Sequence, residues 1–327
     1  MNPVSLRKLL PLVIAAVLAL SVGRPAVAQD YPNKPIRLIN PWTPAGPAEL
    51  LARLVGNKIS EQLGQPVVIE SKPGANGTIG ATFVAKSAPD GYTLLFSHVG
   101  PIAISPAVVE KMPYDSVKDF EPITQVAAGA LVLLVRNDLP VRTVKDLIEH
   151  AKANPGKLSC GSVGPASTTH LACEQLNMLG GISTIHVPYK GSAPVITDMI
   201  GGSISISFLN IAGVLPQIKA GQLRPIAVTT LKRSAVLPEL PTMNEILPGF
   251  EVNSWYGMMA PAGTPKAIVT LLQQAVAKAL RQPDVVEKLA QLGLDGVGST
   301  PAEHAMQIKS DLERWAKIAK AAKLKID

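Results

Sequence analysis

The chain has 327 residues, a formal net charge of +7 and few aromatic residues, which make up 4% of the total. Its lysines and arginines are scattered and form no run, which argues against nucleic acid as a partner. The length suits two domains or one large domain.

The first 28 residues have the pattern of a secretory signal peptide. Arg7 and Lys8 precede an apolar stretch at 9–20, and Ala26-Val27-Ala28 is a small-residue cleavage site. The apolar stretch is short for a membrane span, and no later segment is long enough. We therefore expect cleavage after Ala28 and an exported mature protein that is not embedded in the membrane.

A strand, a tight loop and a helix are expected in succession near the start of the mature chain. Residues 36–40 are expected to form a strand and residues 41–46 a loop, and Pro47 suits the first position of the following helix. The loop contains no lysine, arginine, aspartate or cysteine.

The same succession of strand, loop and helix is expected at 157–179. A short strand breaks at 161–165, and Ser167, Thr168 and Thr169 stand at the head of a helix. A helix start leaves backbone N–H groups without partners and carries partial positive charge, so it can receive an anion. An ordinary N-cap explains the same residues. Because His170 is the only imidazole in either loop, both loops are better suited to binding than to catalysis.

Further strands are expected at 65–70, 92–97, 130–136, 184–188, 203–208, 224–230 and 255–260, with helices between most of them. Capping boxes at Thr143–Asp146 and Thr300–Glu303 mark two helix starts, and Ser192 is expected to cap a third. The alternation favours an α/β fold with a mainly parallel sheet. His98 ends one strand and is interpreted as a hydrogen-bonded loop histidine.

The only two cysteines are Cys160 and Cys173. An oxidising compartment allows them to pair, whereas two buried free thiols explain them equally well. Their spacing, without further cysteines or clustered histidines, does not indicate a metal site.

Six blocks follow one another along the chain: YPNKPIRLINPWTPAGPAELLAR, ESKPGANGTIGATFVAKSAPDGYTLLFS, SCGSVGPASTTHLACEQL, HVPYKGSAPVITDMIGG, VLPELPTMNEI and WYGMMAPAGTP. Together they resemble the tripartite tricarboxylate transporter (TctC/Bug) family of periplasmic solute-binding proteins. The resemblance extends over essentially the whole mature chain.

The resemblance implies a two-lobed, type II periplasmic-binding-protein-like fold, with helix-flanked, mainly parallel sheets and a hinge between the lobes. We expect one lobe from 29–125 plus 250–327 and the other from 126–249. The implied function is capture of a small organic carboxylate between the lobes by a periplasmic monomer, and its delivery to the membrane permease subunits of the same system. No cofactor, metal or catalytic role is implied.

The resemblance also implies which residues bind the ligand. These are Trp42, Thr43, Pro44, Ala45, Gly46, Glu49, Ser97, Ser162, Gly164, Ser167, Thr168, His170, Tyr189, Lys190 and Gly191. Two of them depart from the family pattern. Ala45 stands where glycine is usual, and its Cβ disfavours positive φ. Glu49 stands where aspartate is common.

Two other functions stay open at this point. A ligand-sensing module that docks on a signalling partner fits the same resemblance. An exported hydrolase is less favoured, because the sequence contains neither G-x-S-x-G nor H-E-x-x-H.

Overall fold

The computed structural model describes residues 31–42, 44, 47–322 and 324–325. The predicted signal peptide and its cleavage site lie outside the described residues, as do Thr43, Ala45 and Gly46. Within the described part of the chain, no helix combines the length and apolar character that crossing a membrane requires.

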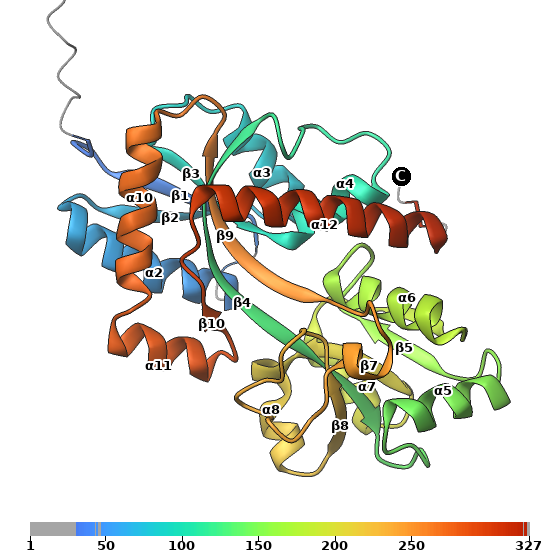
Figure 1. Ribbon diagram of the computed structural model, residues 1–327. Coiled ribbons are helices and arrows are strands. Elements are labelled where there is room, and N and C mark those ends of the chain that lie inside the picture. Colours follow the sequence, from blue (N-terminus) through green and yellow to red (C-terminus); the bar gives the residue numbers. More distant parts are fainter. Residues whose placement is uncertain (1–30, 43, 45–46, 323, 326–327) are drawn as a thin grey trace, which may run out of the picture.

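Strands β1 (Ile36–Asn40), β2 (Val67–Ser71) and β3 (Thr93–His98) pair in parallel and form the outer part of the first half. Helices α2 (Pro47–Leu63), α3 (Thr78–Ala85), α10 (Lys266–Ala279) and α11 (Pro283–Gln291) lie around them (Figure 1). The apolar faces of β1, β3 and α2 share one core with α10, which includes Ile36, Leu38, Leu51, Phe96 and Leu272.

The second half is built in the same way from β5 (Ser159–Ser162), β6 (Ile185–Pro188), β7 (Ile206–Asn210) and β8 (Leu223–Val228). Helices α5 (Val144–Ala153), α6 (Thr168–Gly180), α7 (Ser192–Ile200) and α8 (Ile211–Lys219) surround these strands (Figure 1). A short helix, α9 (Met243–Ile246), precedes the return to the first half.

Two long strands connect the halves. β4 (Phe120–Arg136) and β9 (Asn253–Pro261) run antiparallel side by side, and β4 continues into the second half, where it pairs with β7 and β8 (Figure 1). The two-lobed α/β fold expected from the sequence is thus confirmed. Parallel pairing holds only for the outer strands, because the connecting β4 pairs antiparallel with β9, β7, β8 and the short β10 (Asp295–Gly296).

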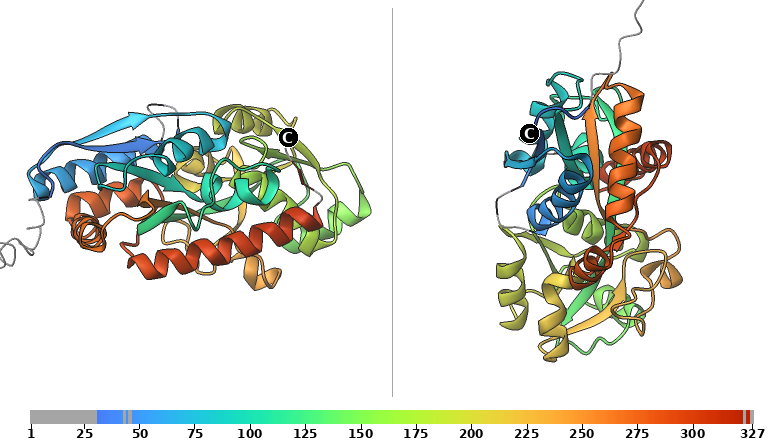
Figure 2. Two further views of the ribbon diagram at one scale, coloured as in Figure 1. Left: turned by 90° about the horizontal axis from the view of Figure 1, so that it is seen from above. Right: turned by 90° about the vertical axis from the view of Figure 1, so that its left-hand side faces the viewer.

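The last helix, α12 (Pro301–Ala321), packs against elements of both halves and extends along one side of the molecule (Figure 2). It contacts α4 (Ser105–Val108) in the first half and α6 in the second. Its buried Trp315 belongs to a core cluster that also includes Leu133 and Cys173. The halves therefore share buried apolar contacts behind the connecting strands.

Local capping chemistry explains several helix boundaries. Both predicted capping boxes, Thr143 with Asp146 and Thr300 with Glu303, are confirmed at the starts of α5 and α12. The predicted cap at Ser192 is wrong, since Ser192 is the first residue of α7 and Gly191 occupies the cap. Gly191 has φ 108°, a conformation that L-residues rarely adopt.

Candidate ligand-binding site

A cavity of about 400 Å³ lies where the two halves face each other. Residues of both halves and of the connecting strands line it: Trp42, Ala48, Asn76, His98, Gly100, Leu131, Val163, Pro165, Ser167, Thr168, Thr169, Gly191, Ser192, Asn210, Ser254 and Tyr256. None of these residues is a lysine, arginine, aspartate or glutamate. A ligand in this cavity would therefore meet neutral donors, neutral acceptors and aromatic rings.

Several helices begin at the cavity wall. Ala48 is the second residue of α2, Thr168 opens α6, Ser192 opens α7, and Asn210 is the N-cap of α8. The first N–H groups of a helix lack partners within the helix, and the aligned peptide dipoles place partial positive charge there. The converging helix starts favour a negatively charged ligand without placing a basic side chain in the described wall.

Local hydrogen bonds fix the start of α6. The Ser167 hydroxyl accepts from the backbone N–H of His170 at 3.2 Å and donates to the carbonyl of Gly164 at 2.6 Å. The Thr169 hydroxyl accepts from the N–H of Val163 at 2.9 Å. Gly164 has φ 134°, which lets the chain turn sharply between β5 and α6. The residues at the start of α6 therefore cap the helix and also line the cavity.

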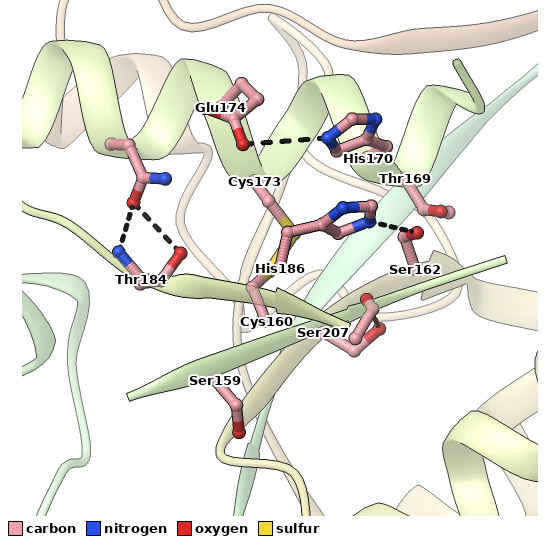
Figure 3. Close-up of a disulfide and its surroundings, with 12 residues drawn as sticks. Ser159, Cys160, Ser162, Thr169, His170, Cys173, Glu174, Thr184, His186 and Ser207 are labelled. Atoms are coloured by element: carbon pink, nitrogen blue, oxygen red, sulfur yellow. Dashed lines mark hydrogen bonds and ion pairs between the residues drawn. A yellow bond between two sulfur atoms is a disulfide. The ribbon is translucent and has the colours of Figure 1, made fainter. Parts of the chain in front are cut away.

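His170 lies behind this loop and does not line the cavity. Its ring stacks on that of His186 with centroids 3.7 Å apart, and its Nε2 lies 3.6 Å from a Glu174 oxygen (Figure 3). The Nδ1 of His170 accepts from the N–H of Ala166 at 3.3 Å. Because each helical residue is rotated by about 100° from the one before, His170 cannot share the outward direction of Thr168. His170 therefore supports the loop from inside the lobe.

The two cysteines form a disulfide directly beneath the same loop. Cys160 lies in β5, Cys173 lies in the second turn of α6, and their Cα atoms are 6.2 Å apart (Figure 3). Both are fully buried. Next to the bridge, the Ser162 hydroxyl lies 2.6 Å from His186 Nε2. Among the described residues, no three histidine, cysteine, aspartate or glutamate side chains are grouped so as to hold a metal ion.

Aromatic and amide groups form the opposite wall. His98 contacts Trp42 edge-on at 5.5 Å and Tyr256 at 4.9 Å between ring centroids. Its Nδ1 accepts from the N–H of Gly100 at 3.1 Å, so the neutral ring carries its proton on Nε2 and donates to the Ser254 hydroxyl, 3.1 Å away. The predicted hydrogen-bonded role of His98 holds, but the residue also forms part of the cavity wall.

Both titratable groups of this wall are neutral near pH 7. Burial lowers the pKa of His98 to about 4 and raises the pKa of Tyr256 to about 12. A neutral His98 presents no positive charge to a ligand.

Several residues expected at the site lie elsewhere. Ser97 is fully buried and points away from His98, because side chains alternate along β3. A Cβ on Gly257 would stand 2.9 Å from the Ser97 hydroxyl and 2.4 Å from His304, so Ser97 faces α12. Glu49 is buried and forms an ion pair with Arg53, whose Nε lies 2.7 Å away.

The third expected segment is divided in the same way. Gly191 lines the cavity, whereas the Tyr189 hydroxyl donates to Asp198 at 2.6 Å and Lys190 is exposed. Ser162, Gly164 and Pro44 are also not among the lining residues. Of the expected ligand-binding residues that the structure describes, the cavity wall contains Trp42, Ser167, Thr168 and Gly191.

The buried histidines predict a pH dependence of stability. Burial lowers the pKa of His98 to about 4 and that of His304 to about 3, against 6.5 in the unfolded chain. Between pH 6.5 and about 4 the unfolded state therefore binds protons that the folded state does not bind. The free energy of unfolding should fall by about 1.4 kcal/mol per pH unit for each such histidine over this range.

Thermal melts of the protein and of His304→Gln between pH 7.5 and 4.5 test this expectation. The variant should lose less stability on acidification than the parent protein. An equal fall in the melting temperature of both proteins between pH 7.5 and 4.5 would contradict it.

Comparison with known proteins agrees with this architecture. Residues 51–324 match the model of the tripartite tricarboxylate transporter family receptor. The chain is 34% identical to the protein BugT of Bordetella pertussis over 98% of this chain and 100% of that protein. It is also similar to two solved structures from Rhodopseudomonas palustris. One is Rpa4515 with adipate, at 37% identity and a TM-score of 0.80, covering 90% of this chain and 99% of that one. The other is MatC with bound malate, at 31% identity and a TM-score of 0.77, covering 88% and 99%.

The matched model describes a family of substrate-binding receptors and not of enzymes. The match includes strands of both halves and the starts of α6, α7 and α8, whereas β1 and the start of α2 precede it. The chain belongs to the tripartite tricarboxylate transporter receptor family.

Proposed function

We propose that this protein is an exported periplasmic receptor that captures a small organic carboxylate in the cavity between its halves. The observation that carries the proposal is the wall of the cavity, where α2, α6, α7 and α8 begin and no described lining residue is charged. Such a wall attracts an anion through backbone dipoles and holds it through N–H groups and hydroxyls. Ser254 and His98 form a hydroxyl–imidazole pair in this wall, but the His98 ring donates to the hydroxyl and is therefore not placed as a base for it.

The proposed ligand contacts follow from the lining residues. Thr168 and Ser192, each at the first position of a helix, present hydroxyls next to unpaired N–H groups. Asn210 and Ser254 add side-chain amide and hydroxyl groups from the second half and from β9. Trp42 and Tyr256 provide apolar contact for a carbon chain.

A thermal-shift screen of mono-, di- and tricarboxylic acids tests the proposal. Adipate and malate come first, because they accompany two of the similar solved structures. A ligand present at 100 times its Kd stabilises the folded state by about 2.7 kcal/mol, which corresponds to a shift on the order of 5–10 °C. No shift with any carboxylate would contradict the proposal.

We further propose that the bound carboxylate is delivered to the permease subunits of a tripartite tricarboxylate transporter. Uptake of the identified radiolabelled acid by cells that lack this receptor, compared with complemented cells, measures this step. Normal uptake without the receptor would instead favour ligand sensing.

Ligand binding is expected to close the two proposed lobes, 29–125 plus 250–327 and 126–249, about β4 and β9. These strands have cavities on both faces. Leu131 and Ser254 line the ligand cavity, whereas Ala130 and Asn253 line a second cavity of about 350 Å³. Bending that narrows one cavity widens the other, so the connecting strands have space to flex in both directions.

Small-angle scattering with and without a ligand from the screen checks this closure. The radius of gyration should decrease at saturation, and the forward scattering should correspond to a monomer. An unchanged profile at saturation would contradict closure.

A further inference from the structure

One residue of the cavity wall, Asn76, has a backbone conformation that is unfavourable for residues other than glycine. Asn76 lies in the 3-10 turn η1 (Ala75–Gly77) with φ 51° and ψ 34°. Residues other than glycine rarely adopt a positive φ, although asparagine tolerates it better than most. Glycine would occupy this position without strain, so what asparagine adds here is the set of contacts that its side chain makes.

The Asn76 amide group connects the two halves of the molecule. Its Nδ2 donates to the Ser105 hydroxyl at 3.2 Å and to the carbonyl of Ala166 at 3.1 Å. Ser105 opens α4 in the same half as Asn76, whereas Ala166 lies 90 residues further along the chain, between β5 and α6. Both amide hydrogens are therefore used, one within its own half and one across the interface.

The acceptor across the interface, the carbonyl of Ala166, belongs to a residue that is also in a constrained conformation. Ala166 is buried and itself has a positive φ of 54°, and its carbonyl accepts from Asn76. Its neighbours Pro165 and Ser167 line the cavity, as does Asn76. The hydrogen bond between the halves thus lies at the edge of the cavity, one residue before the N-cap of α6.

We propose that Asn76 is a positioning residue that latches the start of α6 to the opposite lobe and so slows the release of bound ligand. The proposal rests on the proposed receptor function, because a latch at this place acts on whatever the cavity holds. In the closed protein the bond must break before the lobes separate. Its loss should therefore raise the dissociation rate.

The matched test is Asn76→Gly, which keeps the backbone conformation and removes only the side chain. Stopped-flow measurements with adipate or malate, whichever the wild-type protein binds more tightly, should show dissociation about three- to tenfold faster, the effect of one hydrogen bond. The melting temperature of the ligand-free variant should not fall. Asn76→Asp also tolerates a left-handed conformation, but its carboxylate cannot donate a hydrogen bond. Its ligand should dissociate at least as fast as that of Asn76→Gly.

A ligand-free measurement separates this proposal from the proposed function. The bond is present without ligand, so scattering from ligand-free Asn76→Gly should give a larger radius of gyration than the wild type. If no carboxylate binds the wild type, the receptor proposal fails. The scattering comparison of the ligand-free proteins then tests by itself whether Asn76 holds the two lobes together. Equal dissociation rates, or equal radii of gyration where no ligand binds, would overturn the latch.

Discussion

Replacing the carboxylates of the bound ligand by carboxamides is expected to weaken binding at least about a hundredfold. The cavity offers helix starts at α2, α6, α7 and α8 and no charged side chain among its described lining residues. Hydrogen bonds to a charged partner contribute about 1.5–3 kcal/mol each, and the loss of two such bonds accounts for the factor. A neutral amide would also direct its own N–H groups at the N–H groups of the helix starts.

Isothermal titration calorimetry with adipate against adipamide, and malate against malamide, measures this difference directly. Equal affinities for an acid and its amide would contradict an anion site. Thr168→Val, at the head of α6, should weaken binding of the acid and leave the amide unaffected. Thr197→Val is the matched control, because Thr197 is exposed on α7 and bonds only to its own helix at Ala193.

The parts of the fold that local chemistry determines could be predicted from the sequence. Capping boxes located the starts of α5 and α12, and Pro47 located the start of α2. The full length of β4 could not be predicted. Only 130–136 has an apolar strand pattern, while 120–129 contains proline, glycine and polar residues and becomes a strand by pairing with β9. That pairing joins segments more than a hundred residues apart.

The candidate site divides along the same line. The helix starts at Thr168 and Gly191 could be read from short local patterns of glycine and hydroxyl residues. The direction of each side chain could not, so Ser97 and His170 were expected at the ligand but face the interior. Asn210 and Ser254 lie outside the sequence blocks that carry the family resemblance. Asn76 and Tyr256 lie inside such blocks but were not expected at the ligand, and only the fold brings the four residues to one cavity.

Removal of the disulfide between Cys160 and Cys173 is expected to lower both the stability of the protein and its affinity for the ligand. Cys160 and Cys173 connect β5 to α6 with their Cα atoms 6.2 Å apart. The bridge closes a loop of about 14 residues, which in the chain-entropy model stabilises the folded state by about 3 kcal/mol. For a protein of this size, the melting temperature should fall on the order of 5–10 °C.

The affinity should fall as well, because the closed loop contains the residues at the head of α6. Ser167, Thr168 and Thr169 all lie between the two cysteines and line the cavity. Without the bridge, binding must also order this loop, and the ordering opposes binding. The loss of affinity should be larger for carboxylates than for amides, since the ordered N–H groups act on the anion.

The double variant Cys160→Ala with Cys173→Ala, measured beside the wild type with and without reductant, tests both effects. Because both sulfurs are fully buried, the wild type should resist reduction while folded, and should melt like the variant only after reduction during unfolding and refolding. Mass spectrometry of the alkylated, non-reduced protein provides the direct control. Two alkylated cysteines in freshly purified protein would show that the bridge does not form, and an unchanged melting temperature in the double variant would show that it contributes nothing to stability.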